Sequence, residues 1–213
     1  MTIASEEPFY RLMLDYLHQL PSTEKFVGAF TELDATHPAP PIIEDAPLPF
    51  IAKADWTALA SEKSADLVAA FAKVRHDLPW HVPYSGDPLA GPGFSTGAAS
   101  TGRIGPTAPV RSDVFASGFF AVGPGVDYFD HQHEPEELYL PIAGKAEFWS
   151  ESLGWHEAGP DDLMVHPQWE WHAMKTGDQP ILIFWAWLGP EGFGRLPDLR
   201  AAMGGVPQDV PAA

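Results

Sequence analysis

Two histidines and a glutamate stand close together between residues 125 and 144. His131 and His133 are two positions apart, so on a β-strand their side chains project from the same face and can hold one metal ion together. Glu137 follows four residues later, after a bend at Pro135, and can add a carboxylate oxygen. This spacing predicts most of a metal site.

A fourth candidate ligand, His172, lies far downstream in a stretch that reads as strand, turn and strand. Three imidazole nitrogens and one carboxylate oxygen suit a divalent transition metal such as Zn, Fe, Mn, Ni, Co or Cu. The chain has no cysteine, so thiolates cannot contribute. His166 is expected to be a poorer ligand because it precedes the turn. Such a set leaves metal positions open for a substrate, as catalytic sites do, although ordinary histidines in a metal-free barrel stay an alternative.

Two tyrosines are placed to do acid–base chemistry. Tyr139 lies two residues after Glu137, so it leaves the same face of the strand, and Tyr128 lies five residues before His133. A phenol beside a divalent cation ionises below its free pKa of about 10, and the phenolate can then take a carbon-bound proton. The alternative is that both tyrosines only pack in the interior with hydrogen-bonded hydroxyls.

The elements that must position these residues belong to an acidic, globular protein. Of the 213 residues, 45% are hydrophobic and 19% charged, which is enough for a substantial core. The net charge of −17 argues against binding to nucleic acid or to an anionic membrane surface. Without a basic region followed by an apolar run at the N-terminus, and without a membrane-length apolar stretch, we expect a soluble, cytoplasmic protein.

Residues 1–110 are expected to form an N-terminal α-helical extension. Apolar residues recur at helical spacing from Ser5 to Pro21, then over 22–33, and again from about 55 to 76. Five prolines between 37 and 49 predict an extended connector. The Gly- and Pro-rich segment 85–109 predicts a long loop of the linker or lid kind.

Residues 111–213 are expected to form a second domain, a β-barrel that carries the metal site. Short apolar runs separated by Gly, Pro and Asp cover 115–122, 126–133, 136–142, 145–150, 154–157, 162–166, 170–176 and 180–188. Eight short strands at this spacing indicate a sandwich or barrel of the jelly-roll type. The predicted fold class is therefore mainly β.

The candidate ligands lie in a pattern that resembles the cupins. The first cupin motif has glycine, His-x-His, glutamate and glycine at fixed distances, and it is matched without insertion by Gly125, His131, His133, Glu137 and Gly144. The second motif is matched more loosely by Gly159, Pro167 and His172. Trp169 stands where that motif usually has glycine, and Thr176 where it usually has asparagine. The resemblance implies a cupin jelly-roll β-barrel in the C-terminal half.

Among cupins, the chain is most similar to the dimethylsulfoniopropionate lyases. These have His-x-His, three residues, Glu, one residue and Tyr, with another tyrosine upstream, which here are His131, His133, Glu137, Tyr139 and Tyr128. The resemblance implies a β-elimination in which a metal-bound carboxylate acidifies the α-carbon, Tyr139 removes the α-proton, and dimethyl sulfide leaves to give acrylate. Tyr128 would assist by hydrogen bonding. The resemblance leaves open whether His131 is a direct metal ligand.

The substrate that this resemblance implies is a small zwitterion, a sulfonium with a carboxylate. Aromatic faces attract a cation by about 0.5 to 2 kcal/mol. The chain has eight tryptophans. Candidates for this contact are Trp80, Tyr84, Trp149, Trp171 and Trp185, although core packing is the alternative for each. Trp185 and Trp187 are two positions apart on one predicted strand, so both side chains project from the same face.

Two other functions stay open. One is another metal cupin enzyme, a dioxygenase or isomerase acting on a small carboxylate, and the other is a non-catalytic cupin that binds a small molecule. Tyr139 favours the lyase, because an oxygenase needs no base at that position. The intact ligand set disfavours a pure binding module. The native metal, the true substrate and the assembly state, a homodimer included, are not fixed by the sequence.

Overall fold

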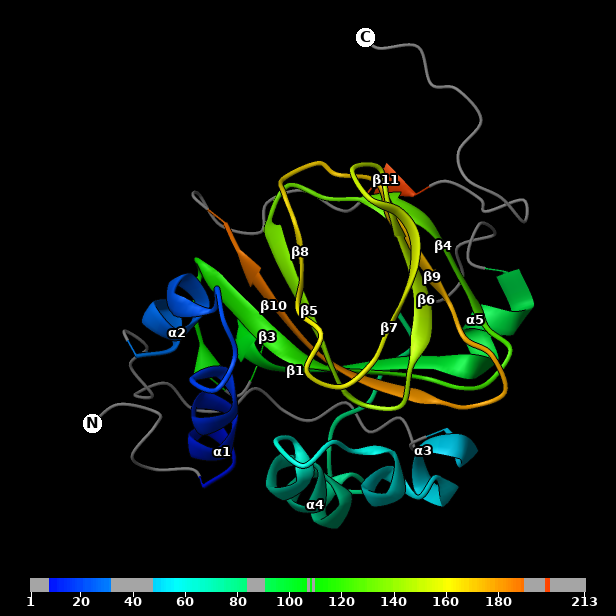
Figure 1. Cartoon of the computed structure of the whole chain (residues 1–213), viewed down its shortest axis with the longest axis horizontal. Coiled ribbons are helices and arrows are strands. Elements are labelled where there is room, and N and C mark those ends of the chain that lie inside the picture. The colour runs from blue at the N-terminus through cyan, green and yellow to red at the C-terminus, as the bar shows by residue number, and fades with distance from the viewer. Residues whose placement is uncertain are drawn as a thin grey trace, which may run out of the picture.

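The structure, a computed structural model, describes residues 8–31, 48–83, 91–106, 108, 110–189 and 198–199. Two sheets face one another around a common interior, and helices cover the outer side of one of them (Figure 1). The larger sheet has the order β2-β1-β3-β10-β5-β8, and the smaller has the order β11-β4-β9-β6-β7. The expected mainly β jelly-roll with an N-terminal helical region is confirmed.

The larger sheet consists of β1 (Ala98–Gly105), β2 (Val110–Arg111), β3 (Phe115–Val122), β5 (Glu136–Ala143), β8 (Met164–His166) and β10 (Ile181–Leu188). The smaller consists of β4 (Asp127–Gln132), β6 (Ala146–Ser150), β7 (Gly154–Ala158), β9 (His172–Lys175) and β11 (Asp198–Leu199). The pairings are antiparallel except between β1 and β2. All eight strands expected after residue 115 are present.

The larger sheet is apolar on both faces, which explains its unbroken hydrophobic runs. On β10, Leu182 and Phe184 pack into the core beneath the helices, whereas Ile183 and Trp185 contact the core between the two sheets. On β5, Leu138 and Leu140 take the helix side, and Tyr139 takes the interior side. Because strand side chains alternate between faces, this register also decides which polar residues enter the interior.

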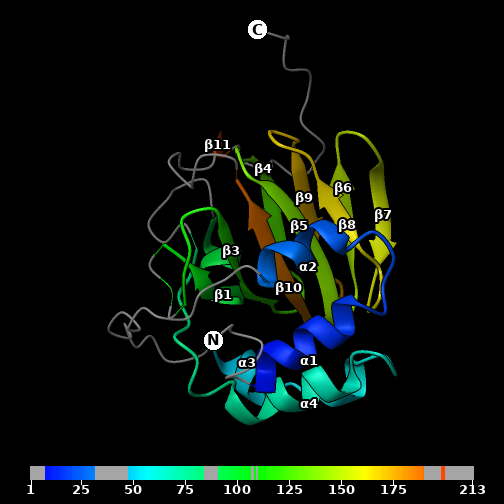
Figure 2. The same cartoon turned by 90° about the vertical axis from the view of Figure 1, so that its left-hand side faces the viewer.

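The helices are α1 (Pro8–Leu17), α2 (Glu24–Thr31), α3 (Pro49–Lys53), the 3-10 helix η2 (Trp56–Leu59), α4 (Ala65–Val74) and α5 (Gly91–Gly97). Helices α1, α2 and α4 lie outside the larger sheet, as Figure 2 shows from the side. None of the helices in the described part of the chain has the length and apolar character needed to cross a membrane.

The third predicted helix is interrupted. Instead of one helix over 55–76, η2 and α4 are separated by a turn. In this turn the backbone N–H of Ser61 donates to Ser64 Oγ, and the N–H of Ser64 donates to Ser61 Oγ. These side chains satisfy backbone donors that a continuous helix would use, so the helix ends and restarts. Most of the expected connector at 37–49 lies outside the described residues.

The segment 85–109 is not one long loop. It contains α5 and β1, and β1 pairs with β3 in the larger sheet. A Cβ added at Gly118 on β3 would lie 1.9 Å from the carbonyl oxygen of Thr101, so the two strands approach closely only because glycine is there. Strand β1 lies before residue 111, so part of the β-sandwich comes from the region 1–110, which was expected to be helical. The division into two domains stays a prediction.

Candidate metal centre

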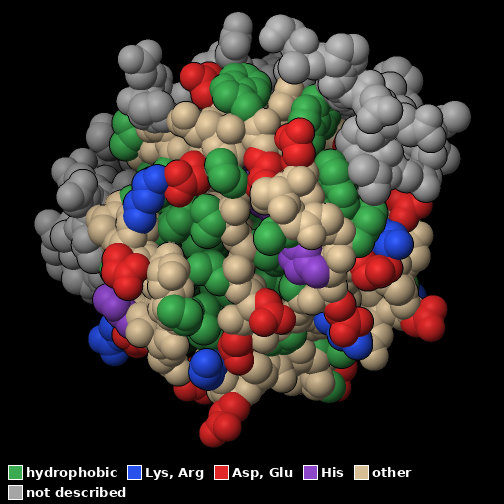
Figure 3. All heavy atoms as spheres, turned by 45° about the horizontal axis from the view of Figure 1, so that its top comes forward, with side chains coloured by type: hydrophobic (Ala, Val, Ile, Leu, Met, Phe, Trp, Pro, Cys, Tyr) green, Lys and Arg blue, Asp and Glu red, His purple; other side chains and the backbone are tan. Residues whose placement is uncertain are grey.

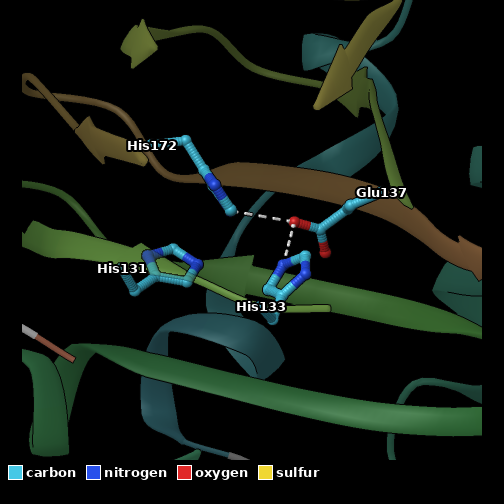
Figure 4. Close-up of side chains that lie close together, drawn as sticks. All are labelled: His131, His133, Glu137 and His172. Atoms are coloured by element: carbon cyan, nitrogen blue, oxygen red, sulfur yellow. Dashed lines mark hydrogen bonds and ion pairs between the residues drawn. The ribbon is translucent and has the colours of Figure 1, made fainter. Parts of the chain in front are cut away.

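Four side chains from three strands converge between the two sheets. His131 and His133 lie in and directly after β4, Glu137 lies on β5, and His172 begins β9 (Figure 4). All four are buried, and one ligand atom from each lies within 4.8 Å of the others. His131 and His172 are direct partners across β4 and β9, which brings the distant histidine to the His-x-His pair.

Two of the imidazoles contact the same carboxylate oxygen, Glu137 Oε2. It lies 3.0 Å from Nε2 of His133 and 3.0 Å from Nε2 of His172 (Figure 4). Nε2 of His172 is fully buried and, despite this short distance, has no partner of hydrogen-bond geometry in the described part of the chain. A buried ring nitrogen left in this way is a candidate metal ligand.

The other ring nitrogen of each histidine fixes its orientation. Nδ1 donates to the carbonyl of Phe129 in His131, of Pro135 in His133 and of Glu170 in His172, over 3.0, 2.9 and 2.9 Å. A carbonyl only accepts, so each Nδ1 carries a proton, and Nε2 is the ring nitrogen that each histidine turns to the cluster. This is the arrangement that orients histidine ligands in metal sites.

The electrostatics of the cluster call for a cation. Burial lowers the pKa of His131 well below its usual value, and it lowers the pKa of His172 to about 4, so both rings are neutral at neutral pH. Burial raises the pKa of Glu137, but its close contacts with the imidazoles of His133 and His172 outweigh this and hold the pKa far below its usual value. The neutral rings of His131 and His172 therefore lie beside the carboxylate of Glu137, and the donor set of three imidazoles and one carboxylate fits a divalent transition-metal ion.

The turn before His172 keeps its shape without the glycine of the cupin motif. The N–H of Glu170 donates to the carbonyl of Pro167 over 3.1 Å, and Trp169 within this turn has a φ of 60°. That left-handed conformation favours glycine. The N–H of Trp169 donates to the carbonyl of His133 over 2.9 Å, which ties the turn to the first motif. Thr176, in place of asparagine, donates to the carbonyl of Gly123 and accepts from the N–H of Val126.

Both candidate catalytic tyrosines face the interior beside the cluster. The ring centroid of Tyr139 lies 6.0 Å from that of His172, with the rings nearly perpendicular. The ring of Tyr128 stacks on His131 at 4.3 Å. On its other side Tyr128 stacks on Phe94 of α5 at 4.8 Å. The structure therefore brings both phenols to the ligand set.

Among the candidate aromatic residues, Trp185 is brought near the site. It is the partner of Tyr139 across β10 and β5 and packs against the interior core. Its Nε1 is buried and makes no hydrogen bond within the residues that the structure describes. Trp187, two residues on, was not singled out from the sequence. Its Nε1 donates to Glu137 Oε1, and its ring lies 4.5 Å from that of His133.

The other candidates are not brought to the cluster. Trp80 is buried in the core beneath the helices, against Phe71, and its Nε1 donates to the carbonyl of Arg75. Trp149 points to the face of β6 opposite Phe148, which occupies the interior. Trp171 is half-buried directly before β9, where His172 takes the inward position. Tyr84 lies outside the described residues.

Little in the sequence indicated that three other residues, Phe94, His166 and Glu170, lie beside the cluster. Phe94 belongs to a glycine-rich segment that predicts a loop. His166 stacks on His172 with ring centroids 4.2 Å apart, and its Nδ1 lies 3.2 Å from Glu170 Oε2. The spacing of four between His166 and Glu170 was the only hint that the two residues form a pair.

Comparisons with known proteins point to one family. Residues 41–183 match the sequence profile of the dimethylsulfoniopropionate lyase family. The dimethylsulfoniopropionate lyase DddQ of Ruegeria pomeroyi (strain ATCC 700808 / DSM 15171 / DSS-3) is 29% identical over 184 residues, which are 86% of this chain and 90% of that protein.

Solved structures show the same likeness. The crystal structure of the lyase DddQ from Ruegeria pomeroyi DSS-3 superposes with a TM-score of 0.73 at 26% identity, covering 92% of this chain and 98% of that one. A chain from the crystal structures of the lyases RdDddP and RnDddQII gives the same score and identity, covering 90% and 95%. Since the family profile matches two thirds of the sequence, the chain belongs to the dimethylsulfoniopropionate lyase family.

Proposed function

We propose that this protein is a metal-dependent lyase that cleaves dimethylsulfoniopropionate to dimethyl sulfide and acrylate, with Tyr139 as the base. The observation that carries the proposal is the position of Tyr139, which shares a strand face with Glu137 and lies edge-on to His172 at 6.0 Å. A phenol beside a set of metal ligands is suited to proton abstraction next to a carboxylate. Family membership supports the choice of substrate.

The reaction balances as a β-elimination. Tyr139, as its phenolate, takes the proton from the α-carbon, and the electron pair of that bond forms the double bond to the β-carbon. The bond between the β-carbon and sulfur breaks, and its electron pair leaves with sulfur as neutral dimethyl sulfide. A divalent cation held by His131, His133, Glu137 and His172 supplies Lewis acidity at the substrate carboxylate when bound. We propose Zn, Fe, Mn, Ni or Co for this ion.

The neighbouring aromatic residues suit the cationic end of the substrate. Trp185 on β10 is the direct partner of Tyr139 on the neighbouring strand β5, and it supplies an indole surface inside the barrel. The ring of Tyr128 stacks on both Phe94 and His131, so it is held beside the cluster with little rotational freedom. Acidic side chains outnumber basic ones on the face seen in Figure 3, in line with the net charge of −17. Such a surface favours the sulfonium end of the zwitterion and disfavours its carboxylate.

The test is product release from purified protein loaded with one metal at a time. Dimethyl sulfide measured by gas chromatography and acrylate measured by liquid chromatography are expected in equal amounts, and chelator treatment is expected to stop both. The control substrate is 3-(methylthio)propionate, which keeps the carboxylate but lacks the sulfonium leaving group, and it should give no acrylate. Oxygen consumption in place of dimethyl sulfide release would instead indicate an oxygenase.

A further inference from the structure

His166 lies beside the ligand cluster without being part of it. It is buried on β8 and is the direct partner of Glu137 across β5 and β8, so both side chains enter the interior from the same face. Its ring lies flat against that of His172, with centroids 4.2 Å apart and an interplanar angle of 9°. This contact leaves the His172 ring little freedom to tilt.

Glu170 holds both of these rings. Its Oε2 lies 3.2 Å from Nδ1 of His166, while its own carbonyl accepts from Nδ1 of His172 over 2.9 Å. The N–H of Ser152 donates to Glu170 Oε1 over 3.2 Å, which anchors the carboxylate to the turn between β6 and β7. Burial raises the pKa of Glu170, but the hydrogen bonds from His166 and Ser152 outweigh this and lower it to about 2. The group is therefore a carboxylate at neutral pH.

His166 also contacts the proposed base, Tyr139. The ring centroid of Tyr139 lies 5.5 Å from that of His166, edge to face, and 6.0 Å from that of His172. The three rings therefore contact one another, and the imidazole of His166 packs against both of the others. A smaller side chain at this position would leave space into which either ring could move.

We propose that His166, oriented by Glu170, is a positioning residue that holds the His172 ring toward the cation and sets its spacing from Tyr139. The proposal rests on the metal centre of the proposed function but concerns residues outside the ligand set. Residues around metal ligands that fix ring orientation typically contribute 10- to 100-fold to metal affinity.

Two substitutions each remove one part of this role, and both parts are needed. His166→Phe keeps a flat ring against His172 but removes the donor to Glu170. His166→Asn places an amide N–H close to the position of Nδ1 but removes the ring. The probe is Co²⁺ alone, titrated into metal-free protein, with the dissociation constant and the visible absorption band of the bound ion as readouts. We expect at least tenfold weaker Co²⁺ binding and a changed band in both variants.

Matched controls are His76→Phe and His76→Asn, at an exposed histidine after α4. They should leave the dissociation constant and the band unchanged. Wild-type affinity and an unaltered band in both His166 variants, each shown to be folded by circular dichroism, would overturn the proposal. So would an equal loss in the His76 variants.

The Co²⁺ readouts do not depend on the substrate. If wild-type protein releases no dimethyl sulfide, the lyase proposal fails, while the titration still decides the role of His166. If it does release the gas, we also expect kcat of both His166 variants to fall about tenfold or more with KM changed less than twofold, because the cation and base are misplaced rather than lost. A change in KM alone would contradict a positioning role.

Discussion

Trp187 and Glu137 are joined across β10 and β5, where the indole Nε1 donates to Glu137 Oε1. The other oxygen of the same carboxylate, Oε2, faces His133 and His172 at 3.0 Å. The indole thereby occupies one side of the carboxylate and leaves the other side for the cluster. The direction in which Glu137 offers its free oxygen is set by a residue fifty positions away.

Replacing this donor should weaken the metal centre. Trp187→Phe keeps an aromatic ring against His133 but leaves Oε1 without the indole N–H, so Glu137 can turn away from the cluster. We expect metal affinity to fall about 10-fold or more, measured by titration of metal-free protein. The control is Trp155→Phe, at a half-exposed ring on β7 that lies under Lys175. Equal affinities of the Trp187 variant and wild type would contradict this role.

Metal removal should make the fold sensitive to acid. In the metal-free protein, burial keeps His131 and His172 neutral, the pKa of His172 being lowered to about 4, whereas the unfolded chain takes up their protons near pH 6.5. The stability that depends on these neutral rings is thus fully present above pH 6.5 and decreases as the pH falls toward 4.

Urea unfolding at pH 7.5 and pH 5 measures this dependence. Chelator-treated protein should show a lower midpoint at pH 5. At pH 7.5, metal at 100 times its dissociation constant should add about 2.7 kcal/mol to the free energy of unfolding. Identical midpoints for the metal-free protein at the two pH values would show that the buried histidines do not control its stability.

Tyr16 should make the stability of the fold depend on pH in the alkaline range. Its hydroxyl on α1 donates to Asp161 Oδ1 over 2.7 Å and accepts from the N–H of Asp161 over 3.1 Å, which joins the helical region to the loop between β7 and β8. Burial, with the Asp161 hydrogen bond adding to it, raises the pKa of Tyr16 well above 10. The folded state favours the neutral phenol, so this stabilisation is complete below pH 10 and decreases as the pH rises above it.

Comparing Tyr16→Phe with wild type isolates this group. We expect the variant to be less stable by about 1 kcal/mol at pH 7, from the lost hydrogen bonds. The difference should shrink between pH 10 and pH 11, because only the wild type must keep a buried phenol neutral there. A difference that stays constant over this range would argue that the phenol does not titrate between the folded and unfolded states.

Two glycines with the same backbone conformation should respond differently to alanine. Gly144 has a φ of 76°, and a Cβ added there would lie 2.2 Å from the carbonyl oxygen of Pro180. Gly154 has a φ of 71°, but nothing lies within 4 Å of such a Cβ. Gly154→Ala should cost about 1 kcal/mol, from the left-handed backbone alone. Gly144→Ala should cost several times more, because the β5–β6 turn must open, and similar losses in thermal unfolding would show that the contact with Pro180 is easily relieved.

The convergence of most of the candidate metal ligands could be predicted from the sequence because their spacing is local. His131, His133 and Glu137 lie within seven residues, so strand alternation and one bend are enough to bring them together. His172 is far away in the chain, and it was identified from its own turn motif rather than from any pairing. The pairing that joins it to His131 is a property of the smaller sheet.

The positions of the tryptophans relative to the site could not be predicted in this way. Which of them enter the interior depends on the register between strands, and alternation alone fixes only that Trp185 and Trp187 share a face. Strand β1 was missed because its residues, Ala-Ala-Ser-Thr-Gly-Arg-Ile-Gly, contain a single β-branched aliphatic residue and no aromatic one. Its strand conformation comes from pairing with β3, where Gly118 permits close approach.

The most direct test of the proposed mechanism is the rate of dimethyl sulfide release by Tyr139→Phe protein with its metal content measured. Tyr10→Phe is the matched control, since Tyr10 lies on α1 and its hydroxyl donates to the carbonyl of Arg103. We predict that Tyr139→Phe binds metal but loses 100-fold or more of the wild-type rate, roughly the contribution of a general base, while Tyr10→Phe retains that rate. Release by metal-loaded Tyr139→Phe at the wild-type rate would contradict the assignment of Tyr139 as the base.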